Sequence, residues 1–76
     1  MSHLFTIQVS GVDLTKDYEG AFYGAGCDDA LIAVVDDTLY LDFNREAPSF
    51  EQAVESAKLD VQKAGAQVVR VMQTPE

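Results

Sequence analysis

The pattern of hydrophobic and polar residues along this chain has four short strand-like stretches and two further stretches with apolar residues at helical spacing. The strand-like stretches are residues 4–9, 30–35, 38–43 and 67–73. The first alternates as a half-buried strand does, and the second and third are short β-rich runs on either side of a two-residue break. In the first stretch, Phe5, Ile7 and Val9 share one side, because successive side chains of a strand point to opposite faces. In the last stretch, Val69 and Val71 share one side in the same way. The pattern therefore predicts four strands.

The first helical stretch lies between the first two strands. Asp13 and Thr15 are both candidate N-caps for it, and Gly26 is placed to end it in a left-handed turn. Gly20 and Gly24 each lower its helix propensity by about 1 kcal/mol relative to alanine, so tertiary packing must stabilise this helix. Its apolar positions are Leu14, Tyr18, Ala21, Phe22 and Ala25.

The second helical stretch has stronger end signals. Ser49 is an N-cap, Gln52 three residues later completes a capping box, and Gly65 ends the helix. Asp60 falls on its polar side. The stripe that we expect to be buried consists of Phe50, Ala53, Val54, Ala57, Val61 and Ala64.

The second and third strands are separated only by Asp36 and Asp37, which predicts a hairpin with a two-residue turn. Such a turn sets the register and places Val35 opposite Thr38. Residues that pair across strands share a face. The face that we expect to be buried carries Ile32, Val34, Leu39, Leu41 and Phe43.

The predicted order is strand, helix, strand, strand, helix, strand. Two right-handed crossovers joined by a hairpin give a ferredoxin-like α+β fold, with a four-stranded antiparallel sheet and both helices on one face. The 76 residues have room for one small domain, which we expect to span residues 1–76. A swapped or intertwined dimer of the same elements is the main alternative.

One face of that sheet would have no helices over it, and this open face is predicted to be unusually apolar. It would carry Leu4, Thr6, Gln8, Leu31, Ala33, Val35, Tyr40, Asp42, Val68, Arg70 and Met72, of which all but Gln8 and Asp42 are interface candidates. A sheet face in contact with water normally alternates to polar residues. We therefore expect a homodimer that forms through this face or through the sheet edges. The alternative is that a small protein simply tolerates some exposed valines and leucines.

Composition narrows the function classes. Thirteen acidic and five basic residues give a formal net charge of -8, which disfavours binding to nucleic acid or to anionic membranes. We find no apolar run of membrane-spanning length and no signal peptide pattern, and the single cysteine cannot form an internal disulfide. We therefore expect a cytoplasmic protein with no cofactor and no direct contact with nucleic acid or membrane.

The candidate polar site is a cluster at one end of the sheet. Cys27, Asp28 and Asp29 precede the second strand, and Arg45 and Glu46 follow the third. The hairpin brings these groups together beside the start of the second helix, where Arg45 can form a forked pair with a carboxylate. A structural role is the first interpretation of this cluster, and a cation site with oxygen ligands is the second.

The nucleophiles give no catalytic set. Cys27 has acidic neighbours, which should raise the pKa of its thiol, so we interpret it as a structural thiol. His3 is the only histidine, and we place it in a flexible start ahead of the first strand. The sequence therefore predicts no catalytic or metal-binding residues.

Several segments resemble a family of small, largely uncharacterised bacterial proteins. The segments are Ala25-Gly26-Cys27-Asp28-Asp29-Ala30, Leu41-Asp42-Phe43-Asn44-Arg45-Glu46-Ala47, Ser56-Ala57, Asp60-Val61, Ala64-Gly65 and Val69-Arg70-Val71. Many members of that family continue into a helix-turn-helix segment, which implies a transcription-regulator-like role. This chain ends at Glu76 without one, so we do not expect direct DNA binding.

These observations lead to a non-catalytic module that associates with itself and contacts a protein partner. The alternative is a small-ligand sensor that binds a metabolite at a dimer interface. An enzyme that uses the acidic cluster is the third hypothesis.

Overall fold

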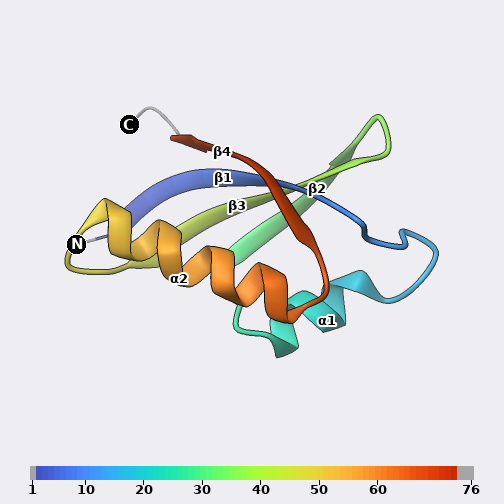
Figure 1. Cartoon of the computed structure of the whole chain (residues 1–76), viewed down its shortest axis with the longest axis horizontal. Helices are drawn as coiled ribbons and strands as arrows, with labels where there is room; N and C mark the ends of the chain where they lie inside the picture. The colour runs from blue at the N-terminus through green and yellow to red at the C-terminus, as the bar shows by residue number, and fades with distance from the viewer. Residues whose placement is uncertain (1, 74–76) are drawn as a thin grey trace.

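In the computed structural model, which describes residues 2–73, two helices lie against one face of a four-stranded antiparallel sheet (Figure 1). The elements in chain order are β1 (Ser2–Ser10), α1 (Tyr18–Gly24), β2 (Ala30–Val35), β3 (Thr38–Glu46), α2 (Phe50–Lys63) and β4 (Gln67–Gln73). The strand order across the sheet is β2-β3-β1-β4, so each helix connects two strands that flank a third. The predicted α+β class with an open antiparallel sheet is confirmed.

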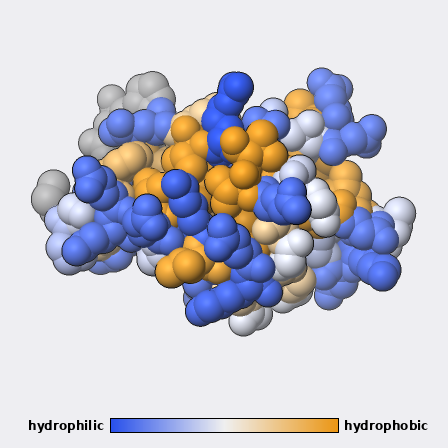
Figure 2. Space-filling model, in the orientation of Figure 1, coloured by the Kyte–Doolittle hydropathy of each residue, from blue (hydrophilic) through white to orange (hydrophobic). Residues whose placement is uncertain are grey.

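The outer side of α2 is mainly polar. Figure 2 shows mostly hydrophilic side chains along this helix, and hydrophobic atoms gather beyond it, over the region that β4 crosses. Leu59 is an exception on the helix, with 57% of its surface exposed, and Tyr23 on α1 is also exposed. Both residues lie off the buried stripes, as the helical spacing predicts.

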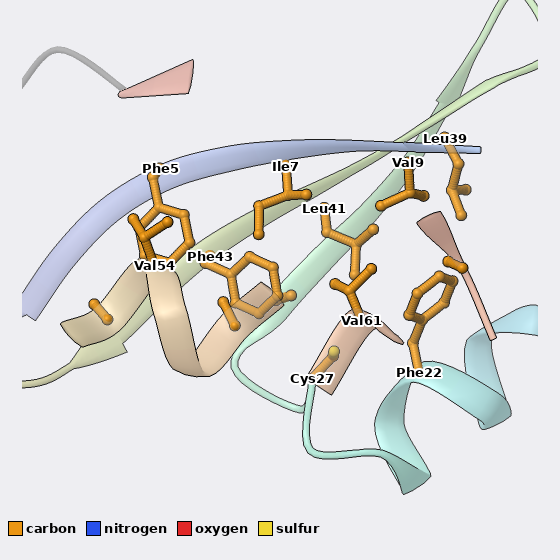
Figure 3. Packing of buried hydrophobic residues seen from close by; sticks show 14 residues of the cluster. Phe5, Ile7, Val9, Phe22, Cys27, Leu39, Leu41, Phe43, Val54 and Val61 are labelled. Carbon is orange, nitrogen blue, oxygen red and sulfur yellow. The ribbon is translucent and has the colours of Figure 1, made fainter. Parts of the chain in front are cut away.

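The core lies between the sheet and the helices. Figure 3 shows side chains from β1 and β3 pointing toward Val54 and Val61 of α2 and toward Phe22 of α1. The rings of Phe5 and Phe43 stack with centroids 5.2 Å apart. Burial of these side chains contributes about 25 cal/mol per Å² of apolar surface and is the main stabilising term of the fold.

The β2–β3 hairpin has the predicted register. Val35 pairs with Thr38, and Leu31 pairs with Asp42. Asp36 and Asp37 both adopt positive φ angles, 51° and 61°, as a two-residue hairpin turn requires. Val34 shares the core face as predicted, but it is 44% exposed, because the hairpin tip extends past both helices (Figure 1).

Helix α1 begins later than the sequence predicts. Its N-cap is Asp17, whose carboxylate accepts a hydrogen bond from the backbone N–H of Gly20 at 3.0 Å. Asp13 does not cap the helix and instead accepts hydrogen bonds from the backbone and hydroxyl of Thr15. A Cβ on Gly20 would lie 2.6 Å from the Asp17 carboxylate, so this close approach accounts for the glycine. Phe22 is the one buried residue of α1 and anchors it to the core.

Both helices end in the same hydrogen-bonded motif. The N–H of Cys27 bonds to the carbonyl of Phe22, and the N–H of Ala66 bonds to that of Val61. Gly26, at φ +109°, supplies the left-handed residue that the first of these turns requires. The motif satisfies the last carbonyls of each helix and turns Cys27 into the core beside Phe22.

Strand β4 departs from the predicted alternation. The register shifts between Gln8 and Val9, so that Val9 pairs with Val68 while Gln8 pairs with Arg70. The extra residue in this bulge, Val69, is exposed, and Val68 packs against the core. The prediction that Val68 lies on the open face was therefore wrong, because one bulged residue reverses the face of everything before it.

The first and third strands are also longer than predicted. β1 starts at Ser2 and includes His3, whose placement in a flexible start was wrong. The Nε2 atom of His3 lies 3.3 Å from the carbonyl oxygen of Ala47. β3 continues to Glu46, so Arg45 belongs to the strand and not to a loop after it.

Candidate functional site

The polar cluster is organised around Arg45. This side chain lies on the helix-covered face of β3, and Arg45 is only 8% exposed. Its Nε donates to Oδ2 of Asp29 at 2.7 Å, and its Nη2 donates to Oδ1 at 2.8 Å. The predicted forked pair is therefore present, in the bidentate geometry that makes such pairs strong.

The remaining donors of Arg45 are used as well. Nη2 donates to the carbonyl of Gly26 at 2.9 Å, and Nη1 donates to Oγ of Ser56 at 3.1 Å. Nη1 also lies 3.0 Å from Oδ2 of Asp60. The guanidinium sits over the ring of Phe43, 5.0 Å from its centroid. We call Arg45 with Asp29, Ser56, Asp60 and the Gly26 carbonyl the Arg45 clamp, since it joins the loop before β2, strand β3 and helix α2.

The electrostatics of the clamp keep it ionised. The hydrogen bonds that Arg45 donates to Asp29, reinforced by the charges of Asp29 and Asp60, raise the pKa of Arg45 above its already high usual value, although burial acts in the opposite direction. Because both carboxylates are in place, their attraction to the guanidinium offsets the free-energy cost of removing the Arg45 charge from water. Among residues 2–73, no buried side-chain nitrogen or oxygen lacks a hydrogen-bond partner.

The place of the clamp on α2 differs from the prediction. The cluster contacts Ser56 and Asp60, in the middle and second half of the helix, and not its first turn. Sequence reasoning assigned Asp60 to the solvent side. The available signal was spacing, because Ser56 and Asp60 are four residues apart and each precedes a residue of the buried stripe.

The other motif residues have different positions. Glu46 follows Arg45 in the strand, is exposed, and accepts a hydrogen bond from the hydroxyl of Ser2 at 2.8 Å. Asp28 is exposed beside the clamp. Of the five predicted motif residues, the structure joins Asp29 and Arg45 directly and leaves Asp28 and Glu46 outside the clamp.

Cys27 is fully buried in the core beside Phe22 (Figure 3). Burial raises the pKa of its thiol to about 11, and the negative charge of Asp60 adds to this effect. A thiol with such a pKa stays protonated at neutral pH and is a poor nucleophile or metal ligand. The structure thus supports a packing role for Cys27.

In the part of the chain that the structure describes, the acidic residues do not converge on a cation site. Among residues 2–73, no group of three or more histidine, cysteine or carboxylate side chains is placed to hold a metal ion. Asp29 and Asp60 both face the Arg45 guanidinium.

The open face of the sheet divides into a polar centre and an apolar edge. Thr6 and Gln8 on β1 and Asp42 on β3 lie in the centre, where the hydroxyl of Thr6 donates to Asp42. The apolar residues concentrate on β2, where Leu31 is 75% exposed and Val35 is 56% exposed. The predicted interface residues other than Val68 therefore do share this face, and the most exposed of them lie along one edge.

A shallow hollow of about 440 Å³ lies at one end of the open face. Its lining includes Leu4, Thr6, Leu31 and Asp42, and it extends to Asp29 of the Arg45 clamp. The hollow is therefore lined by both apolar and acidic residues.

The chain matches no protein-family model, no curated protein and no solved structure. Within residues 2–73, neither helix has the length and apolar character that a membrane span requires. The functional argument consequently depends on the surfaces described above.

Proposed function

We propose that this chain is a non-catalytic interaction module of ferredoxin-like fold that associates with itself, in a regulatory or protein-binding role. The strand order, read from the other edge as β4-β1-β3-β2, with both helices on one face, supports the fold assignment. The observation that carries the functional proposal is the open face, where Leu31 and Val35 are more than half exposed and Leu4 and Met72 have no helix over them.

Charge supports the pairing of two open faces. The chain has a formal net charge of -8, so two copies repel one another over most of their surfaces. The open face is different, because its ionisable residues with a charge at neutral pH are only two acids, Asp42 and Glu46, and one base, Arg70. It is therefore the surface on which two copies meet with the least repulsion and the most apolar contact.

The sharpest test uses two exposed leucines. Leu31 lies on the open face, and Leu59 lies on the outer side of α2. Sedimentation equilibrium of the wild type is expected to give twice the 8.3 kDa of one chain, with a dissociation constant of about 10 µM or below. Leu31→Lys should weaken association at least tenfold, and the matched control Leu59→Lys should not change it.

Two outcomes of that experiment would reject the proposal. One is a monomeric wild type at a concentration of about 200 µM, far above the expected dissociation constant. The other is equal weakening by Leu31→Lys and Leu59→Lys, which would mean that added charge at any exposed leucine has the same effect.

The hollow beside Leu4, Thr6, Leu31 and Asp42 favours a second candidate function, in which this domain senses a small ligand at a dimer interface. Pairing of two open faces would enclose the hollow and increase the buried ligand surface. A thermal-shift screen of metabolites tests this, since a ligand at 100 times its dissociation constant adds about 2.7 kcal/mol. Stabilisation that survives the Leu31→Lys substitution would contradict an interface site.

A further inference from the structure

Strand β2 forms one edge of the sheet, and its sequence lacks the usual protection of an edge. Within the described residues 2–73, β3 is its only neighbouring strand. Its six residues, Ala30–Val35, are all apolar and include no charge, glycine or proline. Long exposed apolar edges are templates for pairing with a further strand, and natural proteins normally protect them.

The backbone of β2 has hydrogen-bonding groups directed away from the sheet. The N–H of Asn44 bonds to the carbonyl of Asp29, which fixes the alternation of the β2–β3 ladder. By this alternation, residues 31, 33 and 35 bond toward β3, and Ile32 and Val34 direct their N–H and C=O groups outward. No hydrogen bond from another part of residues 2–73 reaches these outward groups. They form a row ready to pair with an added strand.

The opposite edge, β4, is protected. It has a bulge at Val69, a charge at Arg70, and glutamines at both of its ends, Gln67 and Gln73. Bulges and charges prevent edge-to-edge pairing. Any strand addition is therefore directed to β2.

The charges around β2 indicate what kind of strand could pair with its free edge. The segment from Asp28 to Asn44 holds five aspartates and no basic residue. Arg45 neutralises Asp29, but Asp28 at one end of β2 and Asp36 and Asp37 at the other are exposed. The apolar edge is thus flanked at both ends by negative charge, which favours a partner that is positive at both ends.

The same charges oppose pairing of β2 with β2 of a second copy. An antiparallel pair that uses these outward groups, with Ile32 opposite Ile32 and Ala30 opposite Val34, would place Asp28 opposite Asp36 at both ends. Like charges directly opposite each other destabilise a sheet. A second copy is therefore the less favourable occupant of this edge.

We propose that the β2 edge binds an extended segment of a partner protein, apolar at alternate positions and carrying lysine or arginine at both ends, as a fifth strand. Main-chain hydrogen bonds to Ile32 and Val34 supply affinity, and the flanking aspartates supply selectivity. This interaction uses the strand's backbone edge and does not require that the open faces pair.

The experiment titrates the ¹⁵N-labelled chain with the capped decapeptide KKTVTVTVKK and follows amide signals by NMR. We expect a dissociation constant of about 100 µM, the largest shifts and new exchange protection at Ile32 and Val34, and at least fivefold weakening when salt is raised from about 20 to 300 mM. The control peptides EETVTVTVEE and KKTVPVTVKK should bind at least tenfold more weakly.

Two variants complete the test. Val34→Pro removes an outward N–H without breaking the β2–β3 ladder, since proline is tolerated on an edge strand, and should weaken peptide binding at least tenfold. Its matched control, Val34→Thr, keeps the N–H and should bind within about twofold of wild type. If Val34→Pro does not fold, Asp36→Asn with Asp37→Asn replaces it, because asparagine tolerates positive φ. That pair should weaken binding about threefold or more.

The result that overturns the proposal is equal binding of the lysine and glutamate peptides, absence of binding at about 1 mM peptide, or unchanged binding by Val34→Pro. Dissociation of a wild-type dimer by Val34→Pro would also overturn it, because the edge would then be occupied by a second copy. Leu31→Lys separates this proposal from self-association, since it tests the open face in the absence of peptide.

Discussion

The two faces of the sheet are made by alternate residues of the same strands, yet they differ in whether their side chains have partners within the protein. On the face that the helices cover, even a charged residue, Arg45, has a partner for each of its donor nitrogens. On the open face, even a large apolar residue, Leu31, has three quarters of its surface in contact with solvent. Stability is concentrated on the first face, and the capacity for interaction on the second.

This difference follows from where water is excluded. A polar group that loses its water must find a partner within the protein, so Asp29, Ser56 and Asp60 are arranged around Arg45. An apolar group that stays in water only fails to gain the free energy of burial, and it leaves no polar group without a partner. The fold therefore tolerates Leu31 and Val35 on the surface. The covered face therefore constrains residue identity through stability, whereas the open face would do so only through the self-association that we propose.

The largest predicted effect comes from breaking the Arg45 clamp. Arg45→Met leaves Asp29 and Asp60 facing each other without a cation, which should lower the free energy of unfolding by about 3–5 kcal/mol. Arg70→Met, on the open face, should change it by less than about 0.5 kcal/mol. Urea denaturation followed by circular dichroism measures both. Similar losses in the two variants would erase the contrast between the faces.

A pH-dependent test concerns Cys27 on the covered face. Burial, with help from Asp60, raises the pKa of its thiol from 9.0 to about 11, so the thiol ionises near pH 9 when unfolded and near pH 11 when folded. Because the folded value is the higher, its stabilisation is complete below pH 9 and is lost as the pH rises through 11. The stability difference between wild type and Cys27→Ala should shrink by about 2 kcal/mol over this range. Urea unfolding of both proteins at several pH values from 8 to 11 measures this difference. A difference that stays constant over that range would contradict the prediction.

A smaller effect is expected from two glycines near the clamp. Gly26→Ala should destabilise by about 1–2 kcal/mol, because φ is +109° and an added Cβ would lie 3.0 Å from the Asp60 carboxylate. Gly24→Ala has open space around the new Cβ and should stabilise α1 by about 0.5–1 kcal/mol. Thermal unfolding of both variants measures the two changes in stability. If both substitutions change the stability in the same direction, the argument that the clamp requires a glycine at position 26 is contradicted.

The smallest predicted effect is on the open face. Leu31→Thr should change the unfolding free energy of the monomer by less than about 0.5 kcal/mol, since Leu31 gains little burial within one chain. Denaturation at concentrations low enough to keep the chain monomeric is the measurement. A loss above about 1 kcal/mol would show that Leu31 contributes to the core and would weaken the contrast between the two faces.

The fold class and the local turns of this structure could be predicted, and several contacts between distant segments could not. The hairpin register and the start of α2 follow from short-range signals, the Asp36–Asp37 turn and the Ser49 cap. Asp13 and Asp17 are equally good caps by residue type, so the start of α1 was misplaced.

The missed features depend on contacts between segments that are distant in sequence. The bulge at Val69 is set by pairing with β1, and no turn residue marks it. The helical spacing predicts that Asp60 faces solvent, because its ion pair with Arg45 joins two segments that are distant in sequence. The Asp29–Arg45 pair was predictable because both residues belong to one hairpin.

The Arg45 clamp also has a kinetic consequence. It connects residues 29, 45 and 60, which meet only after the hairpin has formed and α2 has docked. We expect a contact made this late to be largely absent from the folding transition state, so that its loss accelerates unfolding more than it slows folding. On this expectation, the clamp contributes mainly to the lifetime of the native state.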